Sequence, residues 1–373
     1  MTVSATLPAG SPSGERTARV PSRRARVVSR VVLALALAWG TYALAGALLA
    51  GRWWLWNGLG LAPPVAHLAV PAVLVAVELL AGARRLRVLA ATGVALVVGL
   101  GQTGVVLPGG VLPDDAGATP DAPTAVVVGW NTFSWDQGHD RGEFFAYLRS
   151  LDADVLLLQE HQHATPPDDR PRPVDDLDRV RRELPGYTAV AAGEFLTLSR
   201  YPVVDSAALR PDDLPPPRTD WPDYWDVRAL RTDVRIGDRT VSLYNTHAPD
   251  LLNVNRSPFG RDFYEELHDS ASRRTSHFSL LQDDLAANPH PVVLTGDLNV
   301  QPGSADLRWY DGLDDAARAG SSPYPGTFPA TFPLWRLDWM LTGDGVEVLD
   351  HEVPGTGAGF STHRPIRATV RFP

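Results

Sequence analysis

The sequence contains no cysteine and no lysine among its 373 residues. The absence of cysteine excludes disulfide bonds and thiolate chemistry, although it leaves the compartment of the protein open. The absence of lysine means that every basic side chain is an arginine, which indicates a bias of composition rather than a functional device. A chain of this length has room for more than one structural unit, because single domains usually run to about 100–200 residues.

Acidic side chains are scarce in the N-terminal third and abundant afterwards. Residues 1–107 carry ten arginines against Glu15 and Glu78, a balance of +8, whereas residues 108–373 carry 24 arginines against 41 acidic residues, a balance of −17. The two parts add up to the net charge of −9. The acidic part lacks the broad positive field that non-specific nucleic-acid binding uses, so a nucleic-acid partner is less favoured than other substrates.

Three long apolar runs follow a basic tail over residues 1–30. They cover Val31–Ala50, Leu61–Gly82 and Val88–Leu107, and each has about the ~20 residues needed to cross a bilayer. A cleaved signal peptide would explain the first run alone, but the two further runs favour an anchor of three transmembrane helices over residues 31–107. We therefore expect a multi-pass protein of the cell membrane whose partner is the lipid bilayer.

The arginines around these runs predict the orientation of the anchor. The tail before the first run and the loop between the second and third runs are basic, whereas the loop between the first and second runs carries only Arg52. The excess of positive charge in cytoplasmic segments then places both basic stretches inside, and everything after residue 107 on the extracytoplasmic side.

The rest of the chain divides into a linker and one outer domain. Residues 108–124 are rich in proline, glycine, aspartate and alanine, which is typical of linkers. Over residues 125–373, short apolar runs typical of strands alternate with helical patterns such as that of residues 143–151. Strands interleaved with helices predict a layered α/β or α+β domain in which helices cover sheets.

Polar side chains fall at or near the ends of the predicted strands. Alternate side chains of a strand share a face, so Asp297 and Asn299 in "VVLTGDLN" should project together, unless they only form the turn that Asp, Asn and Gly also favour. Carboxylates bind hard divalent cations, amides donate to phosphate oxygens and imidazoles transfer protons. Such a set at one rim of a sheet suits metal-assisted phosphoester chemistry. The candidates are Asn131, Glu160, Asn245, His247, Asp297, Asn299, Asp338 and His363.

Seven short motifs follow one another over residues 125–373: "WN", "LLLQE", "LSRYPV", "YNTH", "TGDLN", "RLDWML" and "STHRP". Their order resembles the endonuclease/exonuclease/phosphatase superfamily, which includes DNase I-like nucleases, neutral sphingomyelinases and inositol-polyphosphate phosphatases. The resemblance implies an α/β fold, a four-layer α/β/β/α sandwich of the DNase I-like type, with the site at one end. It also implies dependence on Mg²⁺ or Mn²⁺.

The same resemblance implies roles on the metal side of the site. Glu160 matches the principal metal ligand. Asn131 matches the amide that orients the groups on the metal side and contacts substrate. Asp297 matches the residue that orients or deprotonates the attacking water, and Asn299 matches the amide that contacts the phosphate.

The histidines complete the implied site. His247 matches the histidine that protonates the leaving group or stabilises the phosphate. Asn245 lies two residues earlier on the same face and would contact substrate or support the loop. Asp338 matches the carboxylate that hydrogen-bonds the last histidine, His363, close to the scissile phosphate.

One position departs from the pattern of the superfamily. The sequence reads Ser361-Thr362-His363 where an aspartate usually precedes the histidine, so a neutral hydroxyl replaces a metal-binding carboxylate. The alternatives are single-metal chemistry, weaker metal affinity, or a carboxylate supplied from Asp136 or Asp140. A further alternative is a module that binds phosphate ligands without turnover.

The expected function is that of a metal-dependent phosphoester hydrolase outside the membrane. A tethered site reaches only a short distance, so a lipid-linked phosphate or pyrophosphate at the outer leaflet is the natural substrate. The architecture also resembles membrane-bound actinomycete proteins associated with teicoplanin-type glycopeptide resistance, which by analogy favours a phosphatase acting on a lipid of cell-wall synthesis. A phospholipase C-like phosphodiesterase and a membrane-anchored extracellular nuclease remain as alternatives.

Overall fold

The structure is a computed structural model that describes most of the chain. The described residues are 22–81, 85–106, 122–136, 138–163, 172–212, 226–253, 255–355 and 359–373. Most of the predicted basic tail (1–30) and most of the predicted linker (108–124) therefore lie outside the described residues.

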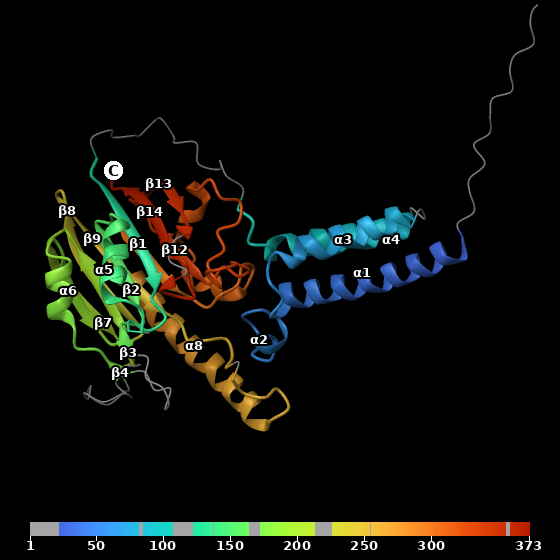
Figure 1. Ribbon diagram of the computed structural model, residues 1–373, viewed down its shortest axis with the longest axis horizontal. Coiled ribbons are helices and arrows are strands. Elements are labelled where there is room, and N and C mark those ends of the chain that lie inside the picture. The colour runs from blue at the N-terminus through green and yellow to red at the C-terminus, as the bar shows by residue number, and fades with distance from the viewer. Residues whose placement is uncertain are drawn as a thin grey trace, which may run out of the picture.

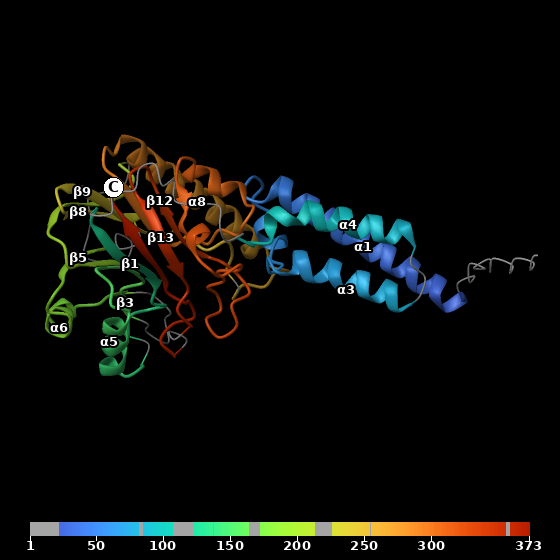
Figure 2. The same cartoon turned by 90° about the horizontal axis from the view of Figure 1, so that it is seen from above.

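The N-terminal helices form a narrow bundle that projects from the rest of the molecule (Figures 1 and 2). α1 (Arg23–Leu49) packs along α3 (Ala66–Leu80) and α4 (Leu86–Gly99), which η1 (Leu100–Gln102) continues. A single turn, α2 (Trp56–Leu59), lies between α1 and α3 in the sequence. Small and branched side chains allow the helices to approach closely, and the buried cluster between them comprises Val32, Ala36, Leu74 and Val88.

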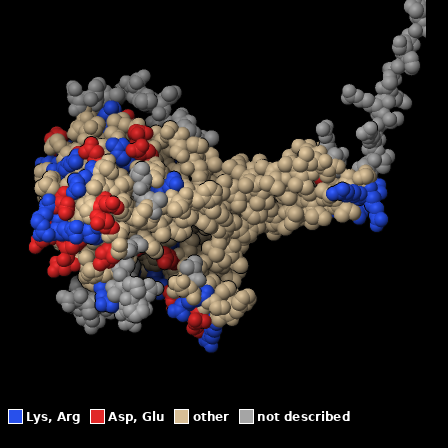
Figure 3. Space-filling model, in the orientation of Figure 1, with Lys and Arg blue, Asp and Glu red and all other residues tan. Residues whose placement is uncertain are grey.

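The face of the bundle seen in Figure 3 is uncharged along most of its length, and basic side chains gather at its end far from the rest of the molecule. α1 begins there with the exposed side chains of Arg23, Arg24 and Arg26. Further along α1, Leu35 and Leu44 are about half exposed. The outer surface of α1 is therefore apolar along its length and basic at its start.

The prediction of three full-length spans is corrected to one. Within the described residues, only α1, with 27 residues, is long and apolar enough to cross a membrane. The second and third runs do fold as helices, but α3 has 15 residues and α4 has 14, fewer than the ~20 that a bilayer requires. Pro63 and Pro64 contribute to this shortening, because proline disfavours helical geometry in the residue before it and α3 begins only at Ala66.

Two six-stranded sheets form the rest of the molecule. The first has the order β13–β14–β1–β2–β6–β5 and the second β11–β12–β10–β9–β8–β7. The bounds in the first sheet are β1 (Thr124–Asn131), β2 (Val155–Gln159), β5 (Thr188–Ala192), β6 (Phe195–Ser199), β13 (Glu347–Glu352) and β14 (Ile366–Arg371). The bounds in the second are β7 (Val203–Leu209), β8 (Ala229–Ile236), β9 (Arg239–His247), β10 (Val292–Asp297), β11 (Asp314–Asp315) and β12 (Asp338–Thr342). β3 (Gln162–His163) pairs antiparallel with β4 (Arg172–Pro173).

The two sheets face each other and helices cover both outer faces, which confirms the predicted four-layer sandwich. Alternation along β1 sends Val127 into the core between the sheets and Val128 outward. α5 (Arg141–Ser150) and α6 (Leu177–Glu183) cover the first sheet. The second sheet is covered by α8 (Arg261–Ala287) and η2 (Ala305–Tyr310), and η3 (Ala316–Ala319) lies beside β13.

Strand pairing brings the predicted polar positions to one end of this sandwich. β1 and β2 run parallel, with Asn131 opposite Gln159, and β9 and β10 run parallel, with His247 opposite Asp297. β12 runs antiparallel to β10, so its first residue, Asp338, also lies opposite Asp297. The carboxyl ends of the central strands in both sheets thus share one rim.

The bundle contacts the sandwich through the loop that follows β10. The backbone N–H of Ala305 donates to the carbonyl of Ala50 at 3.0 Å, directly after α1. Nε2 of Gln301 donates to the carbonyl of Gly60 at 3.1 Å, directly after α2. The loop that begins at the strand-end carboxylate of β10 therefore ends on the bundle.

Candidate active site

Asp297 lies buried at the centre of the candidate site. Its Oδ2 accepts a hydrogen bond from Nδ2 of Asn131 at 3.2 Å and lies 3.6 Å from Nε2 of His363 and 3.8 Å from Nε2 of His247. Its Oδ1 accepts the backbone N–H of Asn299 at 2.9 Å. Four other candidates therefore converge on one carboxylate.

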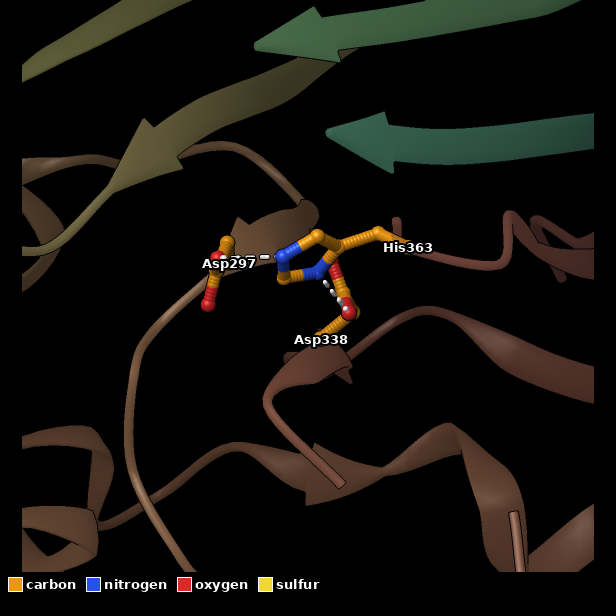
Figure 4. Close-up of side chains that lie close together, drawn as sticks. All are labelled: Asp297, Asp338 and His363. Atoms are coloured by element: carbon orange, nitrogen blue, oxygen red, sulfur yellow. Dashed lines mark hydrogen bonds and ion pairs between the residues drawn. The ribbon is translucent and has the colours of Figure 1, made fainter. Parts of the chain in front are cut away.

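The imidazole of His363 is held between two carboxylates (Figure 4). Its Nδ1 lies 2.9 Å from Oδ2 of Asp338, while Nε2 faces Asp297. Burial alone would lower the pKa of His363, but the charges of Asp338 and Asp297 outweigh burial and raise that pKa to about 9. The backbone N–H of His363 donates to Oγ of Ser361 at 2.9 Å, and its carbonyl accepts from Nε1 of Trp130 at 3.0 Å. The ring is fixed in place and charged at neutral pH.

A second charged imidazole faces the same carboxylate from β9. Nδ1 of His247 lies 3.0 Å from Oε2 of Glu194. Burial lowers the pKa of His247, but the charges of Glu194 and Asp297 outweigh it and raise the pKa well above its ordinary value. Nε2 of His247 is thus directed at Asp297 as a donor.

Glu194 is a site residue that the sequence reasoning missed. It lies in the tight turn between β5 and β6, directly after Gly193, where a polar residue is unremarkable. Its partner His247 is 53 residues away in the sequence. The one available signal was that Glu194, like the other candidates, stands at the end of a predicted strand.

Glu160 directly follows β2 and turns out of the strand. Its φ of +57° is uncommon for a residue with a side chain and re-aims the carboxylate. Partial burial raises the pKa of Glu160, His247 lowers it, and the nearby Glu194 carboxylate raises it further. Asn131 also hydrogen-bonds Glu160, so its amide lies between Glu160 and Asp297. Burial and the neighbouring carboxylate both disfavour the charged form of Glu160. A divalent cation bound there would stabilise that charge.

Asn299 belongs to the site, but it does not continue the alternation of β10. Its φ is +48°, and its Nδ2 donates to the carbonyl of Ala248 at 3.0 Å and to Oδ1 of Asp250 at 3.1 Å. Together with the bond from its N–H to Asp297, these contacts form a turn that joins the loops after β9 and β10. The residues of "GDLN" therefore form a turn, and the amide nitrogen of Asn299 donates within it, while its predicted contact with phosphate stays a prediction.

Asn245 lies on the same face as His247, as alternation predicts, but two residues deeper in the sandwich. Its Oδ1 accepts from Nε2 of Gln159 at 2.6 Å, and its Nδ2 donates to the carbonyls of Leu158 and Leu196 at 3.0 and 3.3 Å. The side chain is fully buried. Asn245 therefore ties β9 to β2 and β6, and the structure does not bring it to the central carboxylate.

The hydroxyl of Thr362 is buried and has no hydrogen-bond partner among the residues that the structure describes. Both aspartates suggested as substitutes for the missing carboxylate are engaged elsewhere. Oδ1 of Asp140 accepts the N–H of Glu143 at 2.9 Å and caps α5, and Asp136 pairs with His163. These contacts assign neither aspartate to the metal side of the site.

Two groups of side chains offer ligand atoms for a cation. The first is Asp297, Asp338 and His363, whose ligand atoms lie within 4.8 Å of one another. In this group the charged imidazole already faces both carboxylates, and a protonated imidazole has no lone pair for a metal. The second is Glu160 with Asn131, which provides oxygen donors. Because hard cations prefer oxygen, the donors fit Mg²⁺ or Mn²⁺.

A cleft of about 390 Å³ opens beside His247. One wall belongs to the site and the loop after β9, and the other belongs to α8. The cleft therefore gives a substrate access to the imidazole from the side of that helix. Its lining includes Glu194, Arg228, His247, Asp250, Glu266, Ser270 and Arg273.

Several solved structures are similar to this chain. An endonuclease/exonuclease/phosphatase from Beutenbergia cavernae is 20% identical, with a TM-score of 0.48 over 67% of this chain and 72% of its own. Mannosyl-6-phosphatase from Bacteroides thetaiotaomicron is 16% identical, with a TM-score of 0.47 over 66% and 100%. Sphingomyelinase C from Streptomyces griseocarneus is 20% identical, with a TM-score of 0.46 over 66% and 99%. No curated protein sequence matches the chain.

A protein-family model decides the relationship. The model described as "Endonuclease/Exonuclease/phosphatase family" matches residues 128–363, well over half of the chain, and this stretch contains all the candidate site residues. The chain therefore belongs to the Endonuclease/Exonuclease/phosphatase family.

Proposed function

We propose that the chain is a divalent-metal-dependent phosphoester hydrolase whose site is the cluster around Asp297. The strongest support is that two charged imidazoles, His247 and His363, direct Nε2 at the same carboxylate, at 3.8 and 3.6 Å. Preorganised positive charge at one point suits a phosphate, whose oxygens carry the charge in the transition state. Bound Mg²⁺ or Mn²⁺, held by Glu160 and Asn131, would add Lewis-acid stabilisation.

Each side chain has a separate task in this proposal. Asp297 orients the attacking water at Oδ2 and takes its proton. His363, which Asp338 holds in its charged form, donates a hydrogen bond to a non-bridging phosphate oxygen. His247, which Glu194 holds in the same way, lies beside the open cleft and protonates the leaving oxygen.

We further propose that this site acts outside a membrane on a lipid-linked phosphate or pyrophosphate of cell-wall synthesis. α1 supplies an apolar span, and the arginines at its far end favour a cytoplasmic location for that end. The sandwich would then lie on the extracytoplasmic side. The bond from Ala305 to Ala50 keeps the catalytic loop close to the outer end of α1, so a phosphate carried by the bilayer is within reach.

The test uses the full-length protein in detergent with Mg²⁺ or Mn²⁺ and measures release of inorganic phosphate from undecaprenyl pyrophosphate. The matched control is Asp297→Ala, in which release should fall by about 10³-fold or more, because the water then lacks its base. Equal release by both proteins would refute the assigned site. Binding of Mn²⁺ without release would refute the lipid pyrophosphate as substrate.

The same protein is assayed with two other substrates to test the alternative functions. Release of a phosphorylated headgroup from phospholipid would instead support a phospholipase C-like phosphodiesterase, and nicking of DNA would support a nuclease. The balance of −17 over residues 108–373 argues against the nuclease, because it repels a polyanion. Binding of Mn²⁺ and phosphate with no turnover of any substrate would support a binding module.

A further inference from the structure

The segment that begins α8 exposes aromatic side chains next to the outer end of the bundle. Phe259, in the turn before the helix, is 98% exposed, and Tyr264 in its first turns is 44% exposed. In the segment after α1, Trp53 is 43% exposed, and Leu59 at the end of α2 is 56% exposed. Apolar side chains that are grouped on one exposed surface indicate a contact with another molecule or with a membrane.

Contacts fix this segment against the turn that follows α1. The backbone of Gly58 approaches Phe263 and Leu267 so closely that a Cβ there would lie 3.7 and 3.4 Å from their side chains. The rings of Trp54 and His268 meet edge to face, with 5.5 Å between their centroids. Figure 1 shows the start of α8 extending from the sandwich on the side of the bundle. The start of α8 therefore lies beside the residues that follow α1, and Tyr264 and Trp54 line the same hollow.

We propose that residues 255–264 and 51–61 together form a bilayer-contact surface that enters the outer interface of the membrane. This inference rests on the proposed placement of α1 across a membrane, but not on the proposed substrate. Continuity with α1 argues for lipid as the occupant, because the surface begins directly at the end of the span. Its composition agrees, since tryptophan and tyrosine favour the interface between hydrocarbon and water.

Two of the three arginines in this surface are paired with carboxylates, and the third, Arg52, donates to the carbonyls of Ala47 and Leu48, so apolar contact is the main attraction to lipid. Arg256 is paired with Asp262 at 3.0 Å, and Arg261 is paired with Glu265 at 2.7 Å. Arginines neutralised in this way add little attraction to an anionic surface. The contact is therefore suited to neutral as well as anionic phospholipid.

The same helix connects the proposed contact to the cleft beside His247. Glu266, Ser270 and Arg273 of α8 line that cleft, only a few turns after the exposed aromatics. Seating the start of α8 in the interface would hold the cleft at a fixed height above the lipid headgroups. The substrate class that this arrangement favours is an amphiphile presented at the bilayer surface.

The absence of natural cysteine makes this inference directly testable. Single cysteines are introduced into the full chain, labelled with a nitroxide and reconstituted in phosphatidylcholine vesicles. Phe259→Cys and Tyr264→Cys are the test positions. Leu35→Cys, 53% exposed on α1, is the lipid reference, and Val204→Cys, 47% exposed on the edge strand β7, is the aqueous reference.

The measurement is the ratio of nitroxide accessibility to oxygen, which enriches in lipid, over accessibility to a water-soluble nickel chelate. We expect the ratios at both test positions to exceed that at position 204 by about threefold or more, approaching that at position 35. The inference would be overturned if the ratios at positions 259 and 264 equalled that at position 204 while position 35 gave a lipid signal. An aqueous signal at position 35 would overturn the membrane placement and the inference with it. None of these readings depends on turnover, so a failed substrate assay leaves them intact.

Discussion

Replacing Asp338 by asparagine would remove the charge that stabilises His363 while keeping the shape of the side chain. Oδ2 of Asp338 lies 2.9 Å from Nδ1 of His363, and both side chains are buried. A hydrogen bond to a charged group contributes about 1.5–3 kcal/mol, and one pKa unit corresponds to about 1.4 kcal/mol. The pKa of His363, about 9 in the natural chain, should therefore fall by about 1–2 units in Asp338→Asn.

The sign of the effect on catalysis follows from the charged form of His363. If the imidazolium is the active form, the rate falls as pH rises through the pKa of His363. The alkaline limb of the pH–rate profile, near 9 in the natural chain, should move to about 7–8 in the variant. The turnover number near neutral pH should also fall by about 100-fold or more, because asparagine can hold the ring in the wrong tautomer. The assay is hydrolysis of p-nitrophenyl phosphate at saturating Mn²⁺.

Asp315→Asn is the matched control for this measurement. Asp315 is a half-buried carboxylate that pairs with Arg336 at 2.6 Å, and its charge acts on His351 and not on His363. Its replacement should lower stability without moving the alkaline limb. A limb that stays at the natural position in Asp338→Asn would refute the assignment of His363 as the charged group.

Three other perturbations test the metal side, the strand geometry and the pH dependence of stability. Glu160→Gln should weaken Mn²⁺ binding by about 100-fold or more, because a neutral amide replaces the carboxylate, and titration calorimetry that finds the natural affinity would contradict the metal assignment. Gly296→Ala should lower the free energy of unfolding by about 3 kcal/mol or more in a denaturant titration, because the added Cβ would lie 1.7 Å from the carbonyl oxygen of Thr246. Burial and the neighbouring Arg336 lower the pKa of His351 from 6.5 to about 4. The neutral form of His351 therefore stabilises the fold above pH 6.5. This contribution to the free energy of unfolding, about 3 kcal/mol, is lost as the pH falls toward 4. Over this pH range, the free energy of unfolding of His351→Gln should fall by about 3 kcal/mol less than that of the natural chain. An unchanged pH dependence would show that His351 is not the group responsible.

The strand ends were predictable from the sequence because they depend on local patterns. An apolar run followed by Asp297, or by Glu160, locates a polar residue at the rim of a sheet whatever the order of the strands. Parallel pairing of β9 with β10 then aligns His247 with Asp297. The motif order added the four-layer arrangement, which the pattern of strands and helices left undecided between α/β and α+β.

The sequence did not predict how deep a side chain lies in the sandwich, or which residues far apart in the chain pair with each other. The alternation of side chains along a strand predicts the face on which Asn245 lies, but not its distance from the rim. The Asn245 amide makes its hydrogen bonds inside the core. Glu194 reaches His247 only because the turn between β5 and β6, in the first sheet, faces the end of β9 in the second sheet. The apolar runs also predicted longer helices than the structure contains. Residues 61–65, for example, do not extend α3 at its start.

In the membrane placement and catalytic roles proposed above, the loop after β10 would make turnover sensitive to mechanical conditions in the bilayer. Only seven residues separate Asp297 from Ala305, which is bonded to the end of α1, and within them Gln301 is bonded to Gly60. A tilt of α1 caused by a thinner or tenser membrane would reach the water-binding carboxylate through this short path. Lipid thickness should therefore act on the catalytic rate constant itself. The sandwich released from its bundle should hydrolyse even a water-soluble ester more slowly, since its catalytic loop would have lost one of its two fixed ends.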